Sequence, residues 1–403
     1  MPSLPSWARW NSIGAERPWT VGIEEEVMLL EPRGWTLVNR VDDVLASLPP
    51  GLPGRASAET HACAVELASR PHGKVAAAAA DLVHLRQALS GTLDLLGLRA
   101  GVAGMHPSVT WAEVEASSGP RYQRIRVSMR DLVRREPTFA LHVHVAVPDG
   151  EAALRALDGV RRDLPLLLAL SANSPYWQGR DTGLASARTP IFSMFPRVGI
   201  PRAFGSYAAY VEAVDALVCC GAVPDPSFLW WDVRLRPHLG TVEVRIMDAQ
   251  TRVAQTTSLA ALVQCLVRLH AEGHAPRAAP TPEALDENRF LAARDGVGAR
   301  LIAADGPRMR PALTALGELL EACRPLAAAL GCAAELEGVA ALAEHPGHAQ
   351  QRSIGQQRGL SGLTAALATA FAPAGGGASG AEDLGLLRGE LLVGEDAIRV
   401  KRA

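Results

Sequence analysis

The stretch TVGIEEEVMLL, residues 20–30, places three consecutive carboxylates inside an apolar run. Val, Ile and Leu flank the acids, so the stretch predicts a β-strand with one buried side. Because side chains alternate between the two faces of a strand, Glu24 and Glu26 share one face and Glu25 points to the other. Two carboxylates one pleat apart repel each other, and burying them without partners costs several kcal/mol. The stretch therefore predicts a cation close to Glu24 and Glu26.

Four further stretches repeat this design of polar side chains on one strand face and apolar side chains on the other. They are AVELAS, FALHVHVAV (139–147), WWDVRLRP and TVEVRIMD (241–248). One such strand usually belongs to an antiparallel sheet with a solvated face. A solvated face predicts Thr, Lys and Ser, whereas these strands repeat Glu, His and Arg. Their polar faces together offer Glu24, Glu26, Glu66, His142, His144, Glu243, Arg234 and Arg245.

These residue types indicate one kind of chemistry. Carboxylates with an occasional imidazole suit a hard divalent cation such as Mg²⁺ or Mn²⁺. Arginines among them suit phosphate oxygens, which a planar guanidinium binds through two hydrogen bonds. The combination predicts phosphoryl transfer from a metal–nucleotide complex. The sequence has no P-loop motif and no GxGxxG after a strand, and HAEGH (270–274) has its Glu at the wrong position for a zinc protease.

The composition excludes several other classes of protein. The 403 residues are 48% hydrophobic and 20% charged, with a formal net charge of -2, which gives no basic surface for nucleic acid or an acidic membrane. No apolar run approaches the roughly 18 residues of a membrane-spanning helix, and the first residues lack the apolar core of a secretory signal. The six cysteines form no CxxC pair, so reduced thiols and a cytoplasmic location are the simplest interpretation.

The organisation along the chain predicts one large domain. We expect residues 1–17 to form an irregular leader, residues 18–372 a single catalytic domain, and residues 373–403 a Gly-rich linker and tail. Within the domain, residues 75–98 predict a helix, and a second helix starts near Glu151 and is kinked or divided by Pro165. Helical periodicity then dominates from about residue 255 to residue 371. The final ELLVGEDAIRVKRA either forms a small strand or partner-binding tail or is disordered.

With these residues in view, the chain resembles the carboxylate–amine ligases related to bacterial glutamate–cysteine ligase, especially the type 2 group. The resemblance covers about residues 18–371. Its matching segments are TVGIEEEVMLL, VELAS, GMHP, PRYQR, LHVHV, LSANSPYWQGRDTGLASARTPIF, WWDVRLRPHLGTVEVRIMD, LAALVQCLV and NRFLAARDG. The resemblance implies an α+β fold in which an antiparallel sheet curves into a half-funnel, related to glutamine synthetase, with a polar concave face and helices packed outside.

The resemblance also implies an activity and roles for single residues. The activity is ATP- and Mg²⁺-dependent formation of an amide through an acyl phosphate, from a small acid such as glutamate, by its γ-carboxylate, and a small amine such as cysteine. The residues implied as ligands of two or three Mg²⁺ ions are Glu24, Glu26, Glu66, His142 and Glu243. Arg245 falls where an arginine reaches the transferred phosphoryl. Arg234 and Arg188 are implied in holding the acid or the phosphates, and His144 in supporting the nucleotide and metal site.

Several alternatives stay open at this point. Arg188 could equally form a structural ion pair, and Ser171, Asn173 and Trp177 either shape the site or fix a turn. Ala140 and Ala146 stand where we expect glycine from the resemblance, so the pocket is expected to be narrower there. A homodimer follows from the resemblance alone. The other functions to weigh are a metal-dependent phosphoryl-transfer or amide-hydrolysing enzyme on the same fold, and a catalytically silent protein that binds a nucleotide or amino acid.

Overall fold

The structure, a computed structural model, describes residues 4–52, 54–134, 137–273 and 280–371, which belong to one compact unit. At its centre is a seven-stranded sheet with the order β10-β11-β5-β1-β3-β2, in which β4 also pairs with β1. Every pairing in this sheet is antiparallel. The strands of the sheet are β1 (Val21–Leu30), β2 (Ala56–Ala58), β3 (Ala64–Ala68), β4 (Arg99–Gly101), β5 (Ala140–Ala146), β10 (Val233–Arg236) and β11 (Thr241–Asp248).

The predicted strands therefore exist, and the α+β class is confirmed. Three smaller two-stranded pairs lie outside the main sheet. They are β6 (Tyr176–Trp177) with β7 (Arg180–Asp181), β8 (Val198–Gly199) with β9 (Trp230–Trp231), and β12 (Arg300–Ile302) with β13 (Met309–Pro311). The WWDVRLRP stretch is thus divided between β9 and β10 at Asp232, whose carboxylate is bound by Arg289.

The register of the sheet places the polar side chains opposite one another. Glu24 on β1 pairs with His142 on β5, and Glu26 pairs with Glu66 on β3. Glu243 on β11 pairs with His144 on β5. Since directly paired residues in an antiparallel sheet share a face, the three pairs lie on the same side, as the alternation in the sequence predicts.

Strand β11 contains a β-bulge that the sequence analysis did not predict. The register with β5 runs regularly to Val244 and then resumes one residue out of step at Met247. Arg245 and Ile246 therefore lie together opposite a single residue of β5, His142. A bulge of this kind turns the strand and redirects side chains. After it, Asp248 pairs with Ala140, so its side chain is on the polar face.

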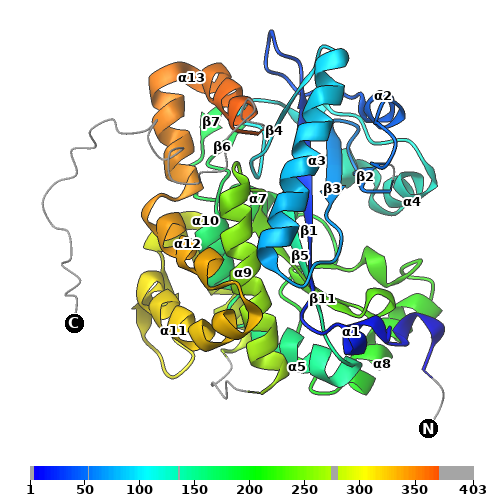
Figure 1. Cartoon of the computed structure of the whole chain (residues 1–403), viewed down its shortest axis with the longest axis vertical. Helices are drawn as coiled ribbons and strands as arrows, with labels where there is room; N and C mark the ends of the chain where they lie inside the picture. The colour runs from blue at the N-terminus through cyan, green and yellow to red at the C-terminus, as the bar shows by residue number, and fades with distance from the viewer. Residues whose placement is uncertain (1–3, 53, 135–136, 274–279, 372–403) are drawn as a thin grey trace, which may run out of the picture. The chain divides into compact units, whose positions relative to one another are not determined.

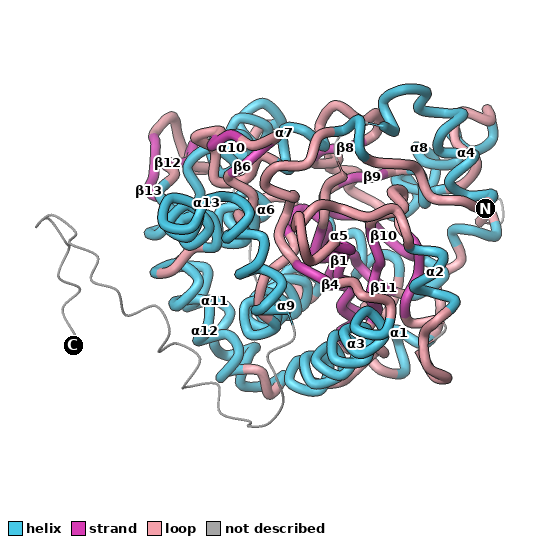
Figure 2. The backbone as a smooth tube through the Cα atoms, turned by 90° about the horizontal axis from the view of Figure 1, so that it is seen from above, coloured by secondary structure: helices cyan, strands magenta, loops and turns pink. Residues whose placement is uncertain are grey.

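The apolar face of the sheet is covered by helices. Helices α3 (Val75–Leu95), α5 (Gly150–Val160), α6 (Leu164–Ser171) and α9 (Val253–Ala271) contact the central strands. Figures 1 and 2 show α3 and α9 next to each other along this side, while Figure 2 shows loops together with β8 and β9 on the opposite side. Fully buried Val143, Val145, Val242 and Val244 form the strand side of this core. Burial of these side chains is the main force that holds the two layers together.

The helices agree with the periodicity of the sequence. Helix α3 covers most of the predicted segment, and Gly97 just beyond its end adopts the positive φ typical of a residue after a helix. Pro165 lies in the first turn of α6, so the second predicted helix is divided, as α5 and α6. The remaining helices are α2 (Val41–Ala46), α4 (Pro120–Met129), α7 (Arg188–Phe192), α8 (Tyr207–Cys219), α10 (Pro282–Asp295), α11 (Ala312–Leu330), α12 (Ala333–Glu344) and α13 (Gly347–Phe371).

The leader that we expected to be irregular contains two short helical segments, η1 (Ser6–Ala8) and α1 (Ile13–Glu16). Trp7 donates a hydrogen bond to Asp215, and Trp10 donates one to the carbonyl of Val147, so the indoles attach this segment to the domain. Among the residues that the structure describes, no helix is both long and apolar enough to cross a membrane. The predicted tail from residue 373 lies outside the described residues.

Candidate active site

The polar face brings together all five side chains expected to bind metal. The ligand atoms of Glu24, His142 and Glu243 lie within 4.8 Å of one another, and so do those of Glu26, Glu66 and His142. The two groups share His142, which stands at the centre of the sheet on β5. Three different strands supply the carboxylates, and the antiparallel register alone makes them converge.

One end of this face is crowded with negative charge. Burial, followed by the neighbouring Glu59, raises the pKa of Glu26 to about 8. Burial and the three carboxylates of Glu24, Glu59 and Glu26 raise the pKa of Glu66 well above its ordinary value. Glutamates directly opposite each other in a sheet, such as Glu26 and Glu66, repel. We call the group of Glu26, Glu59 and Glu66 the acidic end of the site.

Glu59 is a member of the acidic end that the sequence analysis missed. It follows β2 directly, and burial also raises its pKa. Ser57, two residues earlier, lies opposite Glu66 and donates to its carboxylate. The signal in the sequence was the same period of two, continued through Ser57 and Glu59, but β2 is too short and too rich in alanine to predict as a strand.

His142 has the properties of a ligand. Burial, followed by the nearby guanidinium of Arg245, lowers the pKa of His142 to about 3, so its imidazole is neutral. Nδ1 lies 3.3 Å from a carboxylate oxygen of Glu24. Nε2 is buried and has no hydrogen-bond partner among the described residues. A neutral imidazole with a free nitrogen beside several carboxylates is a donor set that fits a divalent cation such as Mg²⁺ or Mn²⁺.

The other end of the face is rich in arginine. Glu243 on β11 is fully buried and accepts from Arg234 through both carboxylate oxygens, at 2.6 and 3.1 Å. Arg245 donates to the same carboxylate. Although burial disfavours its ionisation, Arg234 and Arg245 outweigh that effect and hold the pKa of Glu243 well below its usual value. Glu243 therefore remains an anion held between arginines.

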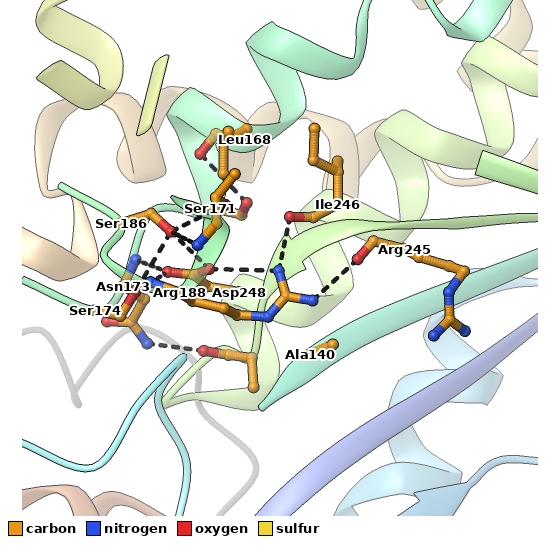
Figure 3. Close-up of polar contacts among 12 residues, drawn as sticks. Ala140, Leu168, Ser171, Asn173, Ser174, Ser186, Arg188, Arg245, Ile246 and Asp248 are labelled. Carbon is orange, nitrogen blue, oxygen red and sulfur yellow. Dashed lines mark hydrogen bonds and ion pairs between the residues drawn. The ribbon is translucent and has the colours of Figure 1, made fainter. Parts of the chain in front are cut away.

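Arg188 lies at the bulge of β11, close enough to the acidic end that its charge favours the ionised form of Glu26. Its guanidinium donates to the carbonyl of Ile246 at 3.0 Å and to that of Arg245 at 3.3 Å. These are the two bulge residues of β11. In Figure 3 the guanidinium of Arg188 points at both carbonyls, whereas the side chain of Arg245 leads away from it. Nε of Arg188 is buried without a hydrogen-bond partner in the described chain, so one donor stays available.

Asp248 and the SANSPYW segment support this arrangement. The carboxylate of Asp248 accepts from Ser174, Ser186 and the backbone N–H of Asn173, and lies 3.6 Å from Arg188. Figure 3 shows these groups gathered around Asp248. The contacts of Asn173 fix the path of the chain next to the bulge.

The remaining predicted residues have separate surroundings. Nδ1 of His144 lies 3.1 Å from the hydroxyl of Thr241, and Nε2 lies 3.2 Å from a carboxylate oxygen of Glu24. Ser171 is buried within α6 and contacts the carbonyl of Leu168. Trp177 lies at the surface on β6, 38% exposed.

Comparisons with known proteins identify the family and the fold of the chain. The family described as "Glutamate-cysteine ligase family 2" matches residues 20–366 of the chain. A protein of Rubrobacter xylanophilus named "Putative glutamate--cysteine ligase 2-3" is 42% identical over 327 residues, which is 81% of this chain and 89% of that protein.

Two solved structures share the fold at low sequence identity. The glutamate–cysteine ligase of Francisella tularensis in complex with AMP has a TM-score of 0.63 at 14% identity, over 88% of this chain and 89% of that one. A bifunctional glutathione synthetase from Pasteurella multocida also has a TM-score of 0.63, at 15% identity, over 90% of this chain and 53% of the other. At these identities the likeness is one of fold.

Proposed function

The chain belongs to glutamate–cysteine ligase family 2, and we propose that it is an ATP-dependent carboxylate–amine ligase whose active site is the polar face of the central sheet. The acid substrate is a glutamate-like amino acid that reacts through its side-chain carboxylate. The acceptor is the amine of a small amino acid such as cysteine. The names of the relatives and the AMP in the Francisella structure support ATP and these substrate classes for the family.

The residues of this chain fit a divalent metal, Mg²⁺ or Mn²⁺. Glu24, His142 and Glu243 would hold one ion, and Glu26, Glu66 and His142 would contribute to a second. Bound there, the metal neutralises phosphate charge during transfer of the terminal phosphoryl group of ATP. Its absence would leave the acidic end with repelling carboxylates, which agrees with the raised pKa values of Glu26 and Glu66.

The reaction takes place in two transfers. An oxygen of the substrate carboxylate attacks the γ-phosphorus of ATP, the bond to ADP breaks, and an acyl phosphate forms. The amine then attacks the acyl carbon, the C–O bond to phosphate breaks, and the amide is released together with phosphate and a proton. Arg245 stabilises the charge on the migrating phosphoryl, and the rigid sheet holds the reactants in line.

One observation carries the proposal. The partly buried carboxylates of the acidic end and the guanidinium of Arg245 lie on the same sheet face, with His142 between them, since Arg245 Nη1 is 3.4 Å from His142 Nδ1. Carboxylates that can hold a metal, together with a guanidinium on the same face, are the groups that phosphoryl transfer from a metal–nucleotide complex uses. Arg188 and Arg234 are proposed to support the site, because their guanidinium groups are held by backbone carbonyls or by Glu243. The homodimer and the cytoplasmic location stay predictions.

Release of ADP, screened over amino acids and amines with mass spectrometry of the products, tests the proposed function. We expect ATP turnover only when an acid and Mg²⁺ are present, and an amide product when an amine is added. With acid and ATP alone, hydroxylamine should trap the acyl phosphate as a hydroxamate. An oxygen label placed in the substrate carboxylate should appear in the released phosphate. Its absence from phosphate would exclude the acyl-phosphate route.

A further inference from the structure

The arginine-rich end of the site carries more positive charge than its carboxylate balances. Arg234, Arg236 and Arg245 all form ion pairs with Glu243. Burial and Arg236 lower the pKa of the nearby His238. Three guanidinium groups around one carboxylate leave a surplus of positive charge at this end.

Arg236 is the arginine that Glu243 holds least closely. Its Nη1 lies 3.5 Å from the nearer carboxylate oxygen, whereas Arg234 approaches to 2.6 Å. Both oxygens of Glu243 are already accepting from Arg234 and Arg245. Charge balance at Glu243 therefore does not require Arg236.

The donors of Arg236 are also not satisfied within the described chain. Nε is buried and has no hydrogen-bond partner there, while the side chain as a whole stays 22% exposed. A buried donor without an acceptor costs about 1–3 kcal/mol. Arg236 ends β10, the edge strand of the sheet, and pairs with Thr241, which contacts His144. A ligand at the polar face can approach Arg236 through the exposed part of its side chain.

We propose that Arg236 binds an anionic oxygen group of a substrate, either a phosphate of the nucleotide or a carboxylate of the acid. The surplus charge attracts the anion, and the terminal nitrogens of the partly exposed guanidinium can donate to its oxygens. This binding role rests on the proposed function for the identity of the anion. The guanidinium groups of Arg234 and Arg245 are bound to Glu243. These two residues are therefore less available to bind the anion.

Equilibrium binding without turnover tests the proposal. Isothermal titration calorimetry would compare Mg²⁺–tripolyphosphate and L-glutamate as probes on Arg236→Gln and Arg236→Lys. Arg324→Gln is the control, because this arginine is 51% exposed on α11 and pairs with surface glutamates. We expect Arg236→Gln to weaken one of the probes by about tenfold or more, and lysine to recover part of the loss. The probe that responds identifies the phosphate or the carboxylate as the bound group.

The melting temperature of the ligand-free protein separates binding from a structural role. Since Arg236 adds to a surplus of like charge, Arg236→Gln should melt at or above the temperature of the wild type. A clear fall in ligand-free melting temperature, unchanged affinity of Arg236→Gln for both probes, or a wild type that binds neither probe, would overturn the proposal. A wild type that binds the probes but forms no amide would contradict the ligase and leave the anion site intact.

Discussion

Arg245 donates a hydrogen bond to Glu243, two residues earlier on β11 and on the same face of the sheet. The same guanidinium nitrogen lies 3.4 Å from His142, a predicted metal ligand. If Arg245 only balances the charge of Glu243, its contact with Glu243 is expected. If Arg245 acts on the transferred phosphoryl group, its position beside His142 is expected. Substitution of Arg245 distinguishes the two roles.

Lysine at position 245 should keep the protein folded and lose catalysis. Arg245→Lys retains the charge but loses the planar fork that can bind two oxygens. We expect kcat to fall by about a hundredfold or more, the usual effect of losing one donor that stabilises transition-state charge. KM for ATP should change much less. Steady-state kinetics at saturating Mg²⁺ measure both, with Arg324→Lys as the control.

The opposite result would assign Arg245 to the scaffold. In that case the lysine variant would retain near-normal kcat, and Arg245→Ala would chiefly lower the melting temperature, because Glu243 would lose one of its charge partners.

Removal of metal should change both stability and activity through Glu26 and Glu66. The two carboxylates lie directly opposite each other, so a cation between them should stabilise the fold. A ligand at a hundred times its Kd adds about 2.7 kcal/mol. We therefore expect EDTA to abolish ATP turnover and Mg²⁺ to raise the melting temperature of the wild type.

Glu66→Gln should reduce this effect of Mg²⁺ and, in EDTA, melt close to the wild type, since the raised pKa of Glu66 already favours its neutral carboxyl, which glutamine resembles. Glu321→Gln on α11, whose side chain is 67% exposed, serves as the control. If EDTA changes neither the ATP turnover nor the melting temperature, the metal site is excluded.

The sequence predicts the sheet face well because strict alternation needs only local information. Glu24, Glu26, His142 and His144 were placed on one face by their spacing alone, and the register confirms it. The bulge in β11 was not predicted, although the alternation of TVEVRIMD breaks at Ile246 and Met247, two consecutive apolar residues, which is where the register shifts. Its two carbonyls accept hydrogen bonds from Arg188 on α7, a contact between residues far apart in the sequence.

Partners of buried charges are the second class of feature that the sequence could not supply. Alternation places Glu25 on the face opposite Glu24 and Glu26, but it does not predict which group forms an ion pair with Glu25. In the structure Arg86 on α3 donates to both carboxylate oxygens of Glu25. It also donates to the carbonyls of Gln250 and Thr251 just after β11. Only the packing of α3 across β1 creates this pair.

Breaking the pair of Glu25 and Arg86 should destabilise the protein strongly. Arg86→Met leaves Glu25 fully buried without its ion-pair partner, and such losses cost about 3–5 kcal/mol. The double variant Glu25→Leu, Arg86→Met buries no charge and should be more stable than Arg86→Met alone. Urea unfolding of the two variants and of Glu25→Leu measures the coupling. If the single and double variants are equally unstable, the carbonyl contacts of Arg86 matter more than its charge pair.

Asp81 should make the stability of the protein depend on pH. Partial burial raises its pKa, but hydrogen bonds from His72, the backbone of Arg70 and the side chain of Arg55 outweigh that and lower the pKa of Asp81 to about 2. A carboxyl with a lowered pKa in the folded state contributes stability above its unfolded pKa, about 3.8, and loses it as the pH falls towards 2. Asp81→Asn should therefore cost about 1–3 kcal/mol at neutral pH, and less as the pH falls below about 4.

Urea unfolding at pH 7, 5 and 3 checks this dependence on Asp81. Asp94→Asn on the same helix is the control, because Asp94 is 57% exposed in its ion pair with Arg99 and should contribute little at any pH. A cost for Asp81→Asn that is the same at pH 3 as at pH 7 would show that the charge of Asp81 is not the stabilising feature.

The network around Asp248 should be sensitive to a single methyl group at Gly104. A Cβ at that position would lie 2.6 Å from the carboxyl carbon of Asp248 and 2.7 Å from one of its oxygens. Gly104→Ala should therefore displace Asp248 from Ser174 and Asn173, at a cost of about 1–3 kcal/mol for overpacking. Gly91→Ala is the matched control, since nothing lies within 4 Å of its added Cβ in α3 and alanine should stabilise that helix by about 0.5–1 kcal/mol.

Because Asp248 also neighbours Arg188, which binds the carbonyl of Arg245, we expect kcat of Gly104→Ala to fall while KM for ATP changes little. Urea unfolding and steady-state kinetics test the two effects separately. A destabilised Gly104→Ala with normal kcat would limit the network to folding, and a variant as stable as the wild type would refute the close approach of Gly104 to Asp248.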